Sequence, residues 1–203
     1  MPKKMPKKKE AILKAATVLF ANKGFTDTSM HELSELTGAA EGTIFYHFKN
    51  KEHLLLTILQ TTNESIVEEF DRFIDGREFK NGLHMVEEIV SFYLYLAGIM
   101  EFQFLLLQRH YLYKFVAENQ DFRSSLEEFY NCISDMFEKA IVRGQQDGSI
   151  GNVHPRKTAL ILFTMVDGVV RFKNFNLYDA GALFNDLIES CRKMLKPDGE
   201  TAR

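Results

Sequence analysis

The sequence lacks several features that would assign it to a class of protein at once. It has no tryptophan, two cysteines and four prolines among 203 residues. Cys132 and Cys191 fall inside helical patterns without metal-ligand spacing, which predicts free thiols in a reducing cytoplasm. No proline occurs between Pro6 and Pro155, so long helices can run unbroken over most of the chain.

Long hydrophobic runs are also missing. The basic start MPKKMPKKKE is not followed by the apolar segment of a secretory signal. The most apolar stretch, Ile89–Leu107, is interrupted by Gly98, Glu101 and Gln103, so its purely apolar part is shorter than the ~20 residues that span a bilayer. We therefore expect two core helices that meet near Gly98, no membrane partner and a cytoplasmic location.

Signatures of the common enzyme classes are absent from the sequence. It contains no Glu-x-x-His motif, which a di-iron helical bundle would need, and His84 with Glu87 lacks the partners for a zinc site. It also contains no phosphate-binding loop, no dinucleotide-binding glycine fingerprint and no nucleophile elbow. We expect no catalytic residue, no metal and no cofactor.

The chain is rich in apolar and aromatic residues, and its charge is unevenly distributed. Apolar residues make up 45% of it, and its 18 Phe and 7 Tyr indicate an aromatic core. Residues 1–55 hold nine lysines against six acidic residues, whereas the remainder holds 16 basic against 22 acidic residues. A basic N-terminal part on an acidic body is typical of a DNA-binding head with a separate body.

Two short helical patterns follow one another between Thr28 and Lys51. Thr28 or Ser29 can cap the first helix, and Gly38 can end it in the left-handed conformation. The second helix starts near Ala40 and places Ile44 and Phe48, four residues apart, on one inward face. This layout fits a helix-turn-helix, and on spacing alone it fits an ordinary helical hairpin equally well.

Three segments, LKAATVLFANKGF, GFTDTSMHELSELTG and GTIFYHFKNKEHLL, together resemble the N-terminal DNA-binding domain of the TetR family of transcriptional regulators. The resemblance covers residues 9–60 without a gap. It implies an all-α fold of about nine helices: a basic arm (1–8), a three-helix helix-turn-helix domain (9–53), a larger helical domain for ligand binding and dimerisation (54–196) and a tail (197–203). It further implies a homodimeric repressor that binds a double-stranded DNA operator and is released by a small apolar or aromatic effector.

The resemblance also implies a set of residues that contact DNA. Three positions depart from the family's pattern: Ala40 replaces a capping Ser, Glu41 stands where Lys is common, and Phe45 lacks the hydroxyl of the usual Tyr. A carboxylate at Glu41 can accept a hydrogen bond from a cytosine amine, so Glu41→Lys should tighten general DNA binding and lose one base preference. The expected DNA contacts are Thr28, Ser29, His31, Glu41, Gly42, Thr43, Phe45, Tyr46, His47 and Lys51.

The body is expected to hold an effector and to pair with a second copy. Aromatic residues with a few polar groups among them indicate a ligand pocket, although they could simply fill the core. The last two helices, about 154–175 and 179–196, carry more apolar surface than one body needs. The expected pocket residues are Phe92, Tyr95, Phe104, Gln108, Tyr111 and Phe129. The expected dimer contacts are Leu160, Phe163, Thr164, Gly168, Leu183, Leu187 and Cys191.

Two alternatives stay open at this point. A helical carrier of apolar ligands that does not bind DNA would share this composition, but it leaves the basic head unexplained. The arm with Lys3, Lys4, Lys7, Lys8 and Lys9 is either a solvated tail or a segment that reaches phosphates. In the second case its deletion should flatten the salt dependence of DNA binding.

Overall fold

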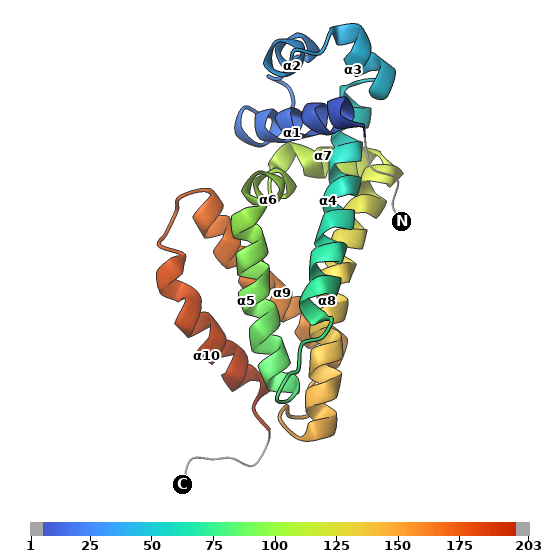
Figure 1. Ribbon diagram of the computed structural model, residues 1–203. Helices are drawn as coiled ribbons and strands as arrows, with labels where there is room; N and C mark the ends of the chain where they lie inside the picture. The colour runs from blue at the N-terminus through green and yellow to red at the C-terminus, as the bar shows by residue number, and fades with distance from the viewer. Residues whose placement is uncertain (1–5, 198–203) are drawn as a thin grey trace. The chain divides into compact units, whose positions relative to one another are not determined.

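The computed structural model describes residues 6–197, which contain ten α-helices, one short 3-10 helix and no strand (Figure 1). These residues form two compact units. Unit 1 contains the described residues up to Ile66 together with Met100–Glu128. Unit 2 contains Val67–Ile99 and the described residues from Phe129 onward. The all-α fold expected from the sequence is confirmed.

Unit 1 holds the predicted N-terminal helices and reaches beyond residue 53. Its helices are α1 (Lys7–Asn22), α2 (Met30–Thr37), α3 (Glu41–His47), α6 (Glu101–Leu107), α7 (His110–Glu118) and the first parts of α4 (Lys51–Ile74) and α8 (Gln120–Asp147). Figure 1 shows α2 and α3 on one side of α1 and α6 on the other, and α1 packs against all three. The N-terminal helices therefore share one core with α6.

The core of unit 1 forms because α1 buries one continuous stripe. Ile12, Ala16 and Phe20 are fully buried, as their helical spacing predicts. Gly24 ends the helix region with a φ of 99°, and the Phe25 ring folds back to 5.3 Å from the Phe20 ring. The helix begins at Lys7, so Lys7, Lys8 and Lys9 lie in α1, whereas Lys3 and Lys4 fall outside the described residues.

Unit 2 consists of α5 (Gly82–Ile99), α9 (Pro155–Asn174), a 3-10 turn (Gly181–Leu183), α10 (Phe184–Leu195) and the second parts of α4 and α8. Helix α10 packs against both α5 and α9 (Figure 1). The start of α5 lies directly on α8, because a Cβ added to Gly82 would be 2.1 Å from the backbone nitrogen of Gly144. The Gly82 N–H also donates to the Asp147 carboxylate at 2.7 Å.

The structure corrects one predicted helix. The sequence predicts a single helix over about Ile99–Ala117, but α6 ends at Leu107 and α7 begins at His110. No glycine or proline marks this break. Arg109 is extended there (φ −73°, ψ 133°), and its guanidinium donates to the carbonyl oxygens of Ala21 and Asn22 at the end of α1. The Tyr111 hydroxyl donates to the Phe20 carbonyl at 2.8 Å.

Among the described residues, no single helix is long and apolar enough to cross a bilayer. Helices α5 and α6 reach that length and composition only as a pair, and the pair is broken at Met100, close to Gly98 as predicted.

Candidate nucleic-acid interface

Helices α2 and α3 form a helix-turn-helix with well-defined ends. The Ser29 hydroxyl accepts a hydrogen bond from the Glu32 N–H at 3.0 Å, so Ser29 rather than Thr28 caps α2. Gly38 follows α2 with a φ of 64°, the left-handed conformation that the sequence predicted. Ala40 precedes α3 and makes no side-chain capping bond, as its lack of a hydroxyl requires.

Helix α3 divides into a buried face and an open face. Ile44 and Phe48 are fully buried, which confirms the predicted inward pair. On the other side, Tyr46 is 84% exposed and Phe45 is 46% exposed. A Cβ added to Gly42 would meet no atom within 4 Å, so this face offers bare backbone to a partner. The predicted contacts Thr43 and His47 are partly exposed on the same short helix.

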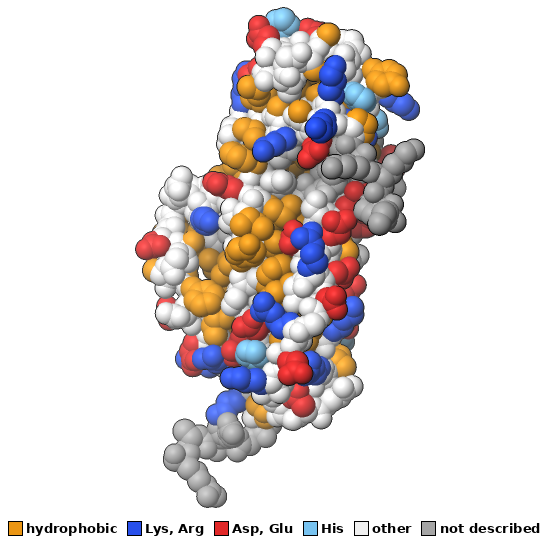
Figure 2. Space-filling view, viewed as in Figure 1, with side chains coloured by type: hydrophobic (Ala, Val, Ile, Leu, Met, Phe, Trp, Pro, Cys, Tyr) orange, Lys and Arg blue, Asp and Glu red, His pale blue; other side chains and the backbone are white. Residues whose placement is uncertain are grey.

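Two lysine side chains lie beside the turn of this helix pair. Lys7 and Lys8, at the start of α1, line a small hollow of about 180 Å³ together with Gly38 and Ala39 of the α2–α3 turn. Figure 2 shows Lys and Arg side chains over α1 and beside α3 on the face in view. Ammonium groups next to an open helix are what a phosphate backbone requires of a binding surface.

Two of the predicted contacts bond to each other. His31 Nδ1 of α2 lies 2.8 Å from Glu41 Oε1 at the start of α3, and His31 Nε2 lies 3.5 Å from Glu35 Oε1. All three side chains are exposed to solvent. The hydrogen bond that the Glu41 carboxylate accepts from the imidazole, followed by the charges of Glu35 and Glu41, raises the pKa of His31.

Two predicted phosphate contacts are instead used inside the protein. Thr28 is 1% exposed, and its hydroxyl donates to the Gly24 carbonyl at 2.8 Å. The Lys51 ammonium donates to the carbonyls of Phe25 at 2.7 Å and Thr28 at 2.9 Å, and it lies 4.4 Å from the centre of the Phe25 ring. These two side chains hold the α1–α2 connection, which corrects the expectation that they face DNA.

The residues predicted to line an effector pocket are divided between the two units. In unit 1, Phe104 and Gln108 are buried, and the Tyr111 hydroxyl is bonded to α1. In unit 2, Phe129 is buried, whereas Tyr95 is 58% exposed, which corrects its prediction as a pocket residue. The remaining predicted residue, Phe92, stacks on Phe73 of α4 with ring centres 4.0 Å apart.

Asn63 is a buried polar residue that the sequence reading missed. It lies in α4 within unit 1, is 8% exposed and donates through Nδ2 to the Ser125 carbonyl at 2.6 Å. Its Oδ1 has no hydrogen-bond partner within the described part of the chain. A buried acceptor without a partner costs roughly 1–3 kcal/mol in stability. A single polar residue in a helical apolar pattern carries no such signal in the sequence.

The predicted dimer contacts are only partly at the surface. Phe163, Leu187 and Cys191 are buried within unit 2, which corrects their assignment to a free face, and Leu183 is half-buried. Helix α9 does expose Leu160, Ile161 and Thr164. Together with the partly buried Gly168 at helical spacing, they are here called the α9 stripe. Leu160 and Ile161 are 43% and 52% exposed, and a Cβ on Gly168 would meet no atom within 4 Å.

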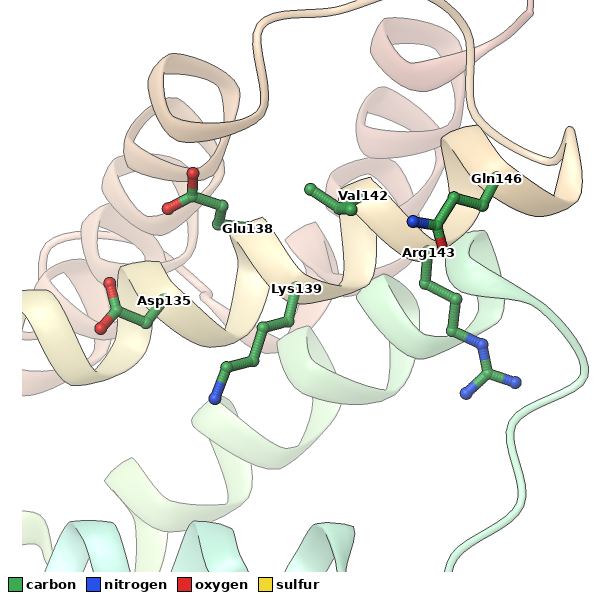
Figure 3. Close-up of a pocket in the computed structure, with 6 residues that line it drawn as sticks. All are labelled: Asp135, Glu138, Lys139, Val142, Arg143 and Gln146. Carbon is green, nitrogen blue, oxygen red and sulfur yellow. The ribbon is translucent and has the colours of Figure 1, made fainter.

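A separate hollow of about 360 Å³ lies along α8 in unit 2 (Figure 3). All six residues that line it come from this one helix, and they include Asp135, Glu138 and Arg143. Arg156 forms ion pairs with Asp135 and Glu138, and Arg143 donates to the Phe79 carbonyl at 2.8 Å. The two carboxylates and the Arg143 guanidinium therefore already have partners within the protein.

Comparison with known proteins agrees with this geometry. Residues 12–58 match the family described as "Bacterial regulatory proteins, tetR family". The chain is 27% identical over 163 residues to the HTH-type transcriptional regulator UidR of Escherichia coli K12, covering 78% of each chain. It is 25% identical over 198 residues to the Fatty acid metabolism regulator protein of Bacillus subtilis, covering 93% of this chain and 95% of that protein.

Solved structures share the fold. The transcriptional regulator FadR from Bacillus subtilis, solved in complex with stearoyl-CoA, superposes with a TM-score of 0.72 at 22% identity, over 92% of this chain and 98% of that one. The exposed helix of a helix-turn-helix, held by two buried side chains, defines a DNA-binding transcriptional regulator rather than an enzyme. Residues 12–58 are a DNA-binding domain of the TetR family, and over most of its length the chain is similar to transcriptional regulators.

Proposed function

We propose that the chain is a repressor that binds a pseudo-palindromic operator as a homodimer and leaves it when a small apolar effector binds. The observation that carries this proposal is the open face of α3. Two fully buried side chains, Ile44 and Phe48, fix the helix, while Tyr46 points into solvent and Gly42 leaves the backbone uncovered. Because it lies on the open face of a helix-turn-helix, we assign Tyr46 to a DNA partner.

The open face of α3 fits the major groove. Tyr46 and Thr43 can donate hydrogen bonds to phosphates or base edges, and Phe45 can contact a thymine methyl. Lys7 and Lys8 beside the turn would add sequence-independent affinity by releasing counterions. The residues that we propose to contact DNA are Ser29, His31, Glu41, Gly42, Thr43, Phe45, Tyr46 and His47.

A second copy of the chain is the partner that we propose for the α9 stripe. Leu160 and Ile161 expose apolar surface, and Gly168 allows a second helix to approach closely. A two-fold pair would carry two copies of α3, as recognition of half-sites ~34–36 Å apart requires. We place this regulator in the cytoplasm, where its DNA is.

The effector that we propose is a long-chain acyl compound. Two comparisons with Bacillus subtilis support this choice, because the similar sequence is named for fatty acid metabolism and the similar structure was solved with stearoyl-CoA. The abundance of aromatic side chains suits an apolar chain. A coupling of about 1–3 kcal/mol between effector and DNA would change operator occupancy 5- to 150-fold.

The test begins with a duplex that the purified full-length protein selects from a random-sequence pool. We expect a gel shift with this duplex that weakens as salt rises, a homodimer by light scattering, and release by stearoyl-CoA but not by free coenzyme A. Tyr46→Ala should abolish selective binding, whereas Tyr95→Ala, a matched exposed tyrosine in unit 2, should retain it. A monomer, or equal binding by both variants, would contradict the proposal.

A further inference from the structure

Three exposed ionisable side chains meet across the turn of the helix-turn-helix. His31 bonds to Glu41 at 2.8 Å, which joins α2 to α3, and it lies 3.5 Å from Glu35 on its own helix. The side chains of His31, Glu35 and Glu41 are 70%, 71% and 44% exposed. Ion pairs at such exposure contribute little to folding, so stability does not explain this arrangement.

His31 is the positive group that can balance the carboxylates of Glu35 and Glu41. Glu32, the next residue on α2, is paired with Lys23 at the end of α1 at 2.8 Å. Glu35 and Glu41 are the charges that act on the imidazole, and with the Glu41 hydrogen bond they raise the pKa of His31. A histidine with a raised pKa stays protonated to a higher pH than an isolated histidine does. The other histidine of the helix pair, His47, lies at the opposite end of α3.

We propose that His31 and Glu41 act as one proton-linked unit in DNA recognition, so that DNA affinity falls as pH rises through the titration of His31. The inference rests on the proposed DNA-binding function. With His31 protonated, the three groups carry a net charge of about −1 and the phosphates meet less repulsion. With His31 neutral, two carboxylates face the DNA unopposed.

The coupling between proton binding and DNA binding determines the direction and the maximum size of the pH effect on affinity. Because DNA stabilises the protonated imidazole, binding takes up a fraction of a proton at pH values near and above the His31 pKa. The uptake cannot exceed one proton per recognition helix, so affinity falls by at most about tenfold per pH unit for each protomer. A fixed carboxylate without this histidine would give no such slope.

The experiment measures fluorescence anisotropy of the full-length protein with its self-selected duplex from pH 6.0 to 8.5 at constant salt. We expect the native protein to lose affinity as pH rises. Glu41→Gln should bind more tightly than the native protein at the alkaline end and show a reduced slope, and His31→Gln should flatten the profile. His110→Gln is the matched control, because it makes the same change at an exposed histidine outside α2 and α3 and should keep the slope.

Two readouts separate the possible failures. An NMR titration of the imidazole should show the His31 pKa returning toward its ordinary value in Glu41→Gln, independently of DNA. Binding with a flat native profile, or a slope that survives His31→Gln, would overturn this inference alone. Failure to bind any duplex at any pH would overturn the proposed function, and this inference with it.

Discussion

Replacing Lys51 with methionine tests whether this lysine binds DNA or holds the protein together. The substitution keeps the apolar stem but removes the ammonium that bonds to the carbonyls of Phe25 and Thr28. Hydrogen bonds from a charged donor contribute roughly 1.5–3 kcal/mol each, but water can replace them at this partly exposed site. We therefore expect a loss of about 2 kcal/mol, which for a chain of this size lowers the Tm by about 4–8 °C.

The exposed neighbour Lys49 provides the control. Lys49→Met should leave the Tm unchanged within about 1 °C, because surface substitutions of this kind are nearly neutral. Circular dichroism melts give the Tm, and DNA titrations at several salt concentrations give the slope of log Kd against log salt. A phosphate contact changes that slope by about 0.9 per site. The reasoning fails if Lys51→Met keeps its Tm and lowers the slope by this amount.

Three further predictions follow from backbone space and charge. Gly42→Ala should raise the stability of α3 by up to about 1 kcal/mol, because the added methyl group meets no atom, while weakening DNA binding in a gel shift. Gly82→Ala should cost more than about 3 kcal/mol in urea unfolding, because the methyl group would overlap the Gly144 backbone; an unchanged midpoint would contradict this packing. Hydrogen bonds, first from the Ser149 side chain and then from backbone N–H groups, lower the pKa of Asp147. The ionised carboxylate therefore stabilises the folded protein at neutral pH, and this stabilisation is lost as pH falls below about 4. In Asp147→Asn, the Tm should fall less steeply with decreasing pH below about 4 than in the native protein. An identical dependence of Tm on pH in the two proteins would refute this prediction.

The helix-turn-helix could be read from the sequence because its signals are local. Ser29, Gly38 and the pair Ile44 and Phe48 each act within a few residues, through a cap, a left-handed turn and one helical repeat. The outward direction of Tyr46 follows from the same repeat. These features were predicted correctly for that reason.

The errors arose where a distant partner decides the outcome. Lys51 looks like a phosphate ligand in sequence, but it bonds to carbonyls more than twenty residues earlier in the chain. The break at Arg109 depends on carbonyls at the end of α1, 87 and 88 residues away. Phe163 and Cys191 have the periodicity of an interface, yet they are buried within unit 2. Periodicity identifies an apolar face and not the surface that covers it.

Arg109 and Tyr111 donate hydrogen bonds to carbonyls in the last turn of α1. These bonds limit how DNA specificity can be transferred from one regulator to another by exchanging domains. A chimera joined just after the third helix would strip α1 of these donors and of the core that it shares with α6. The unit that would have to be transferred consists of two separate segments of the chain. If the recipient's own segment at Met100–Glu128 is kept, it must supply an arginine and a tyrosine at equivalent positions.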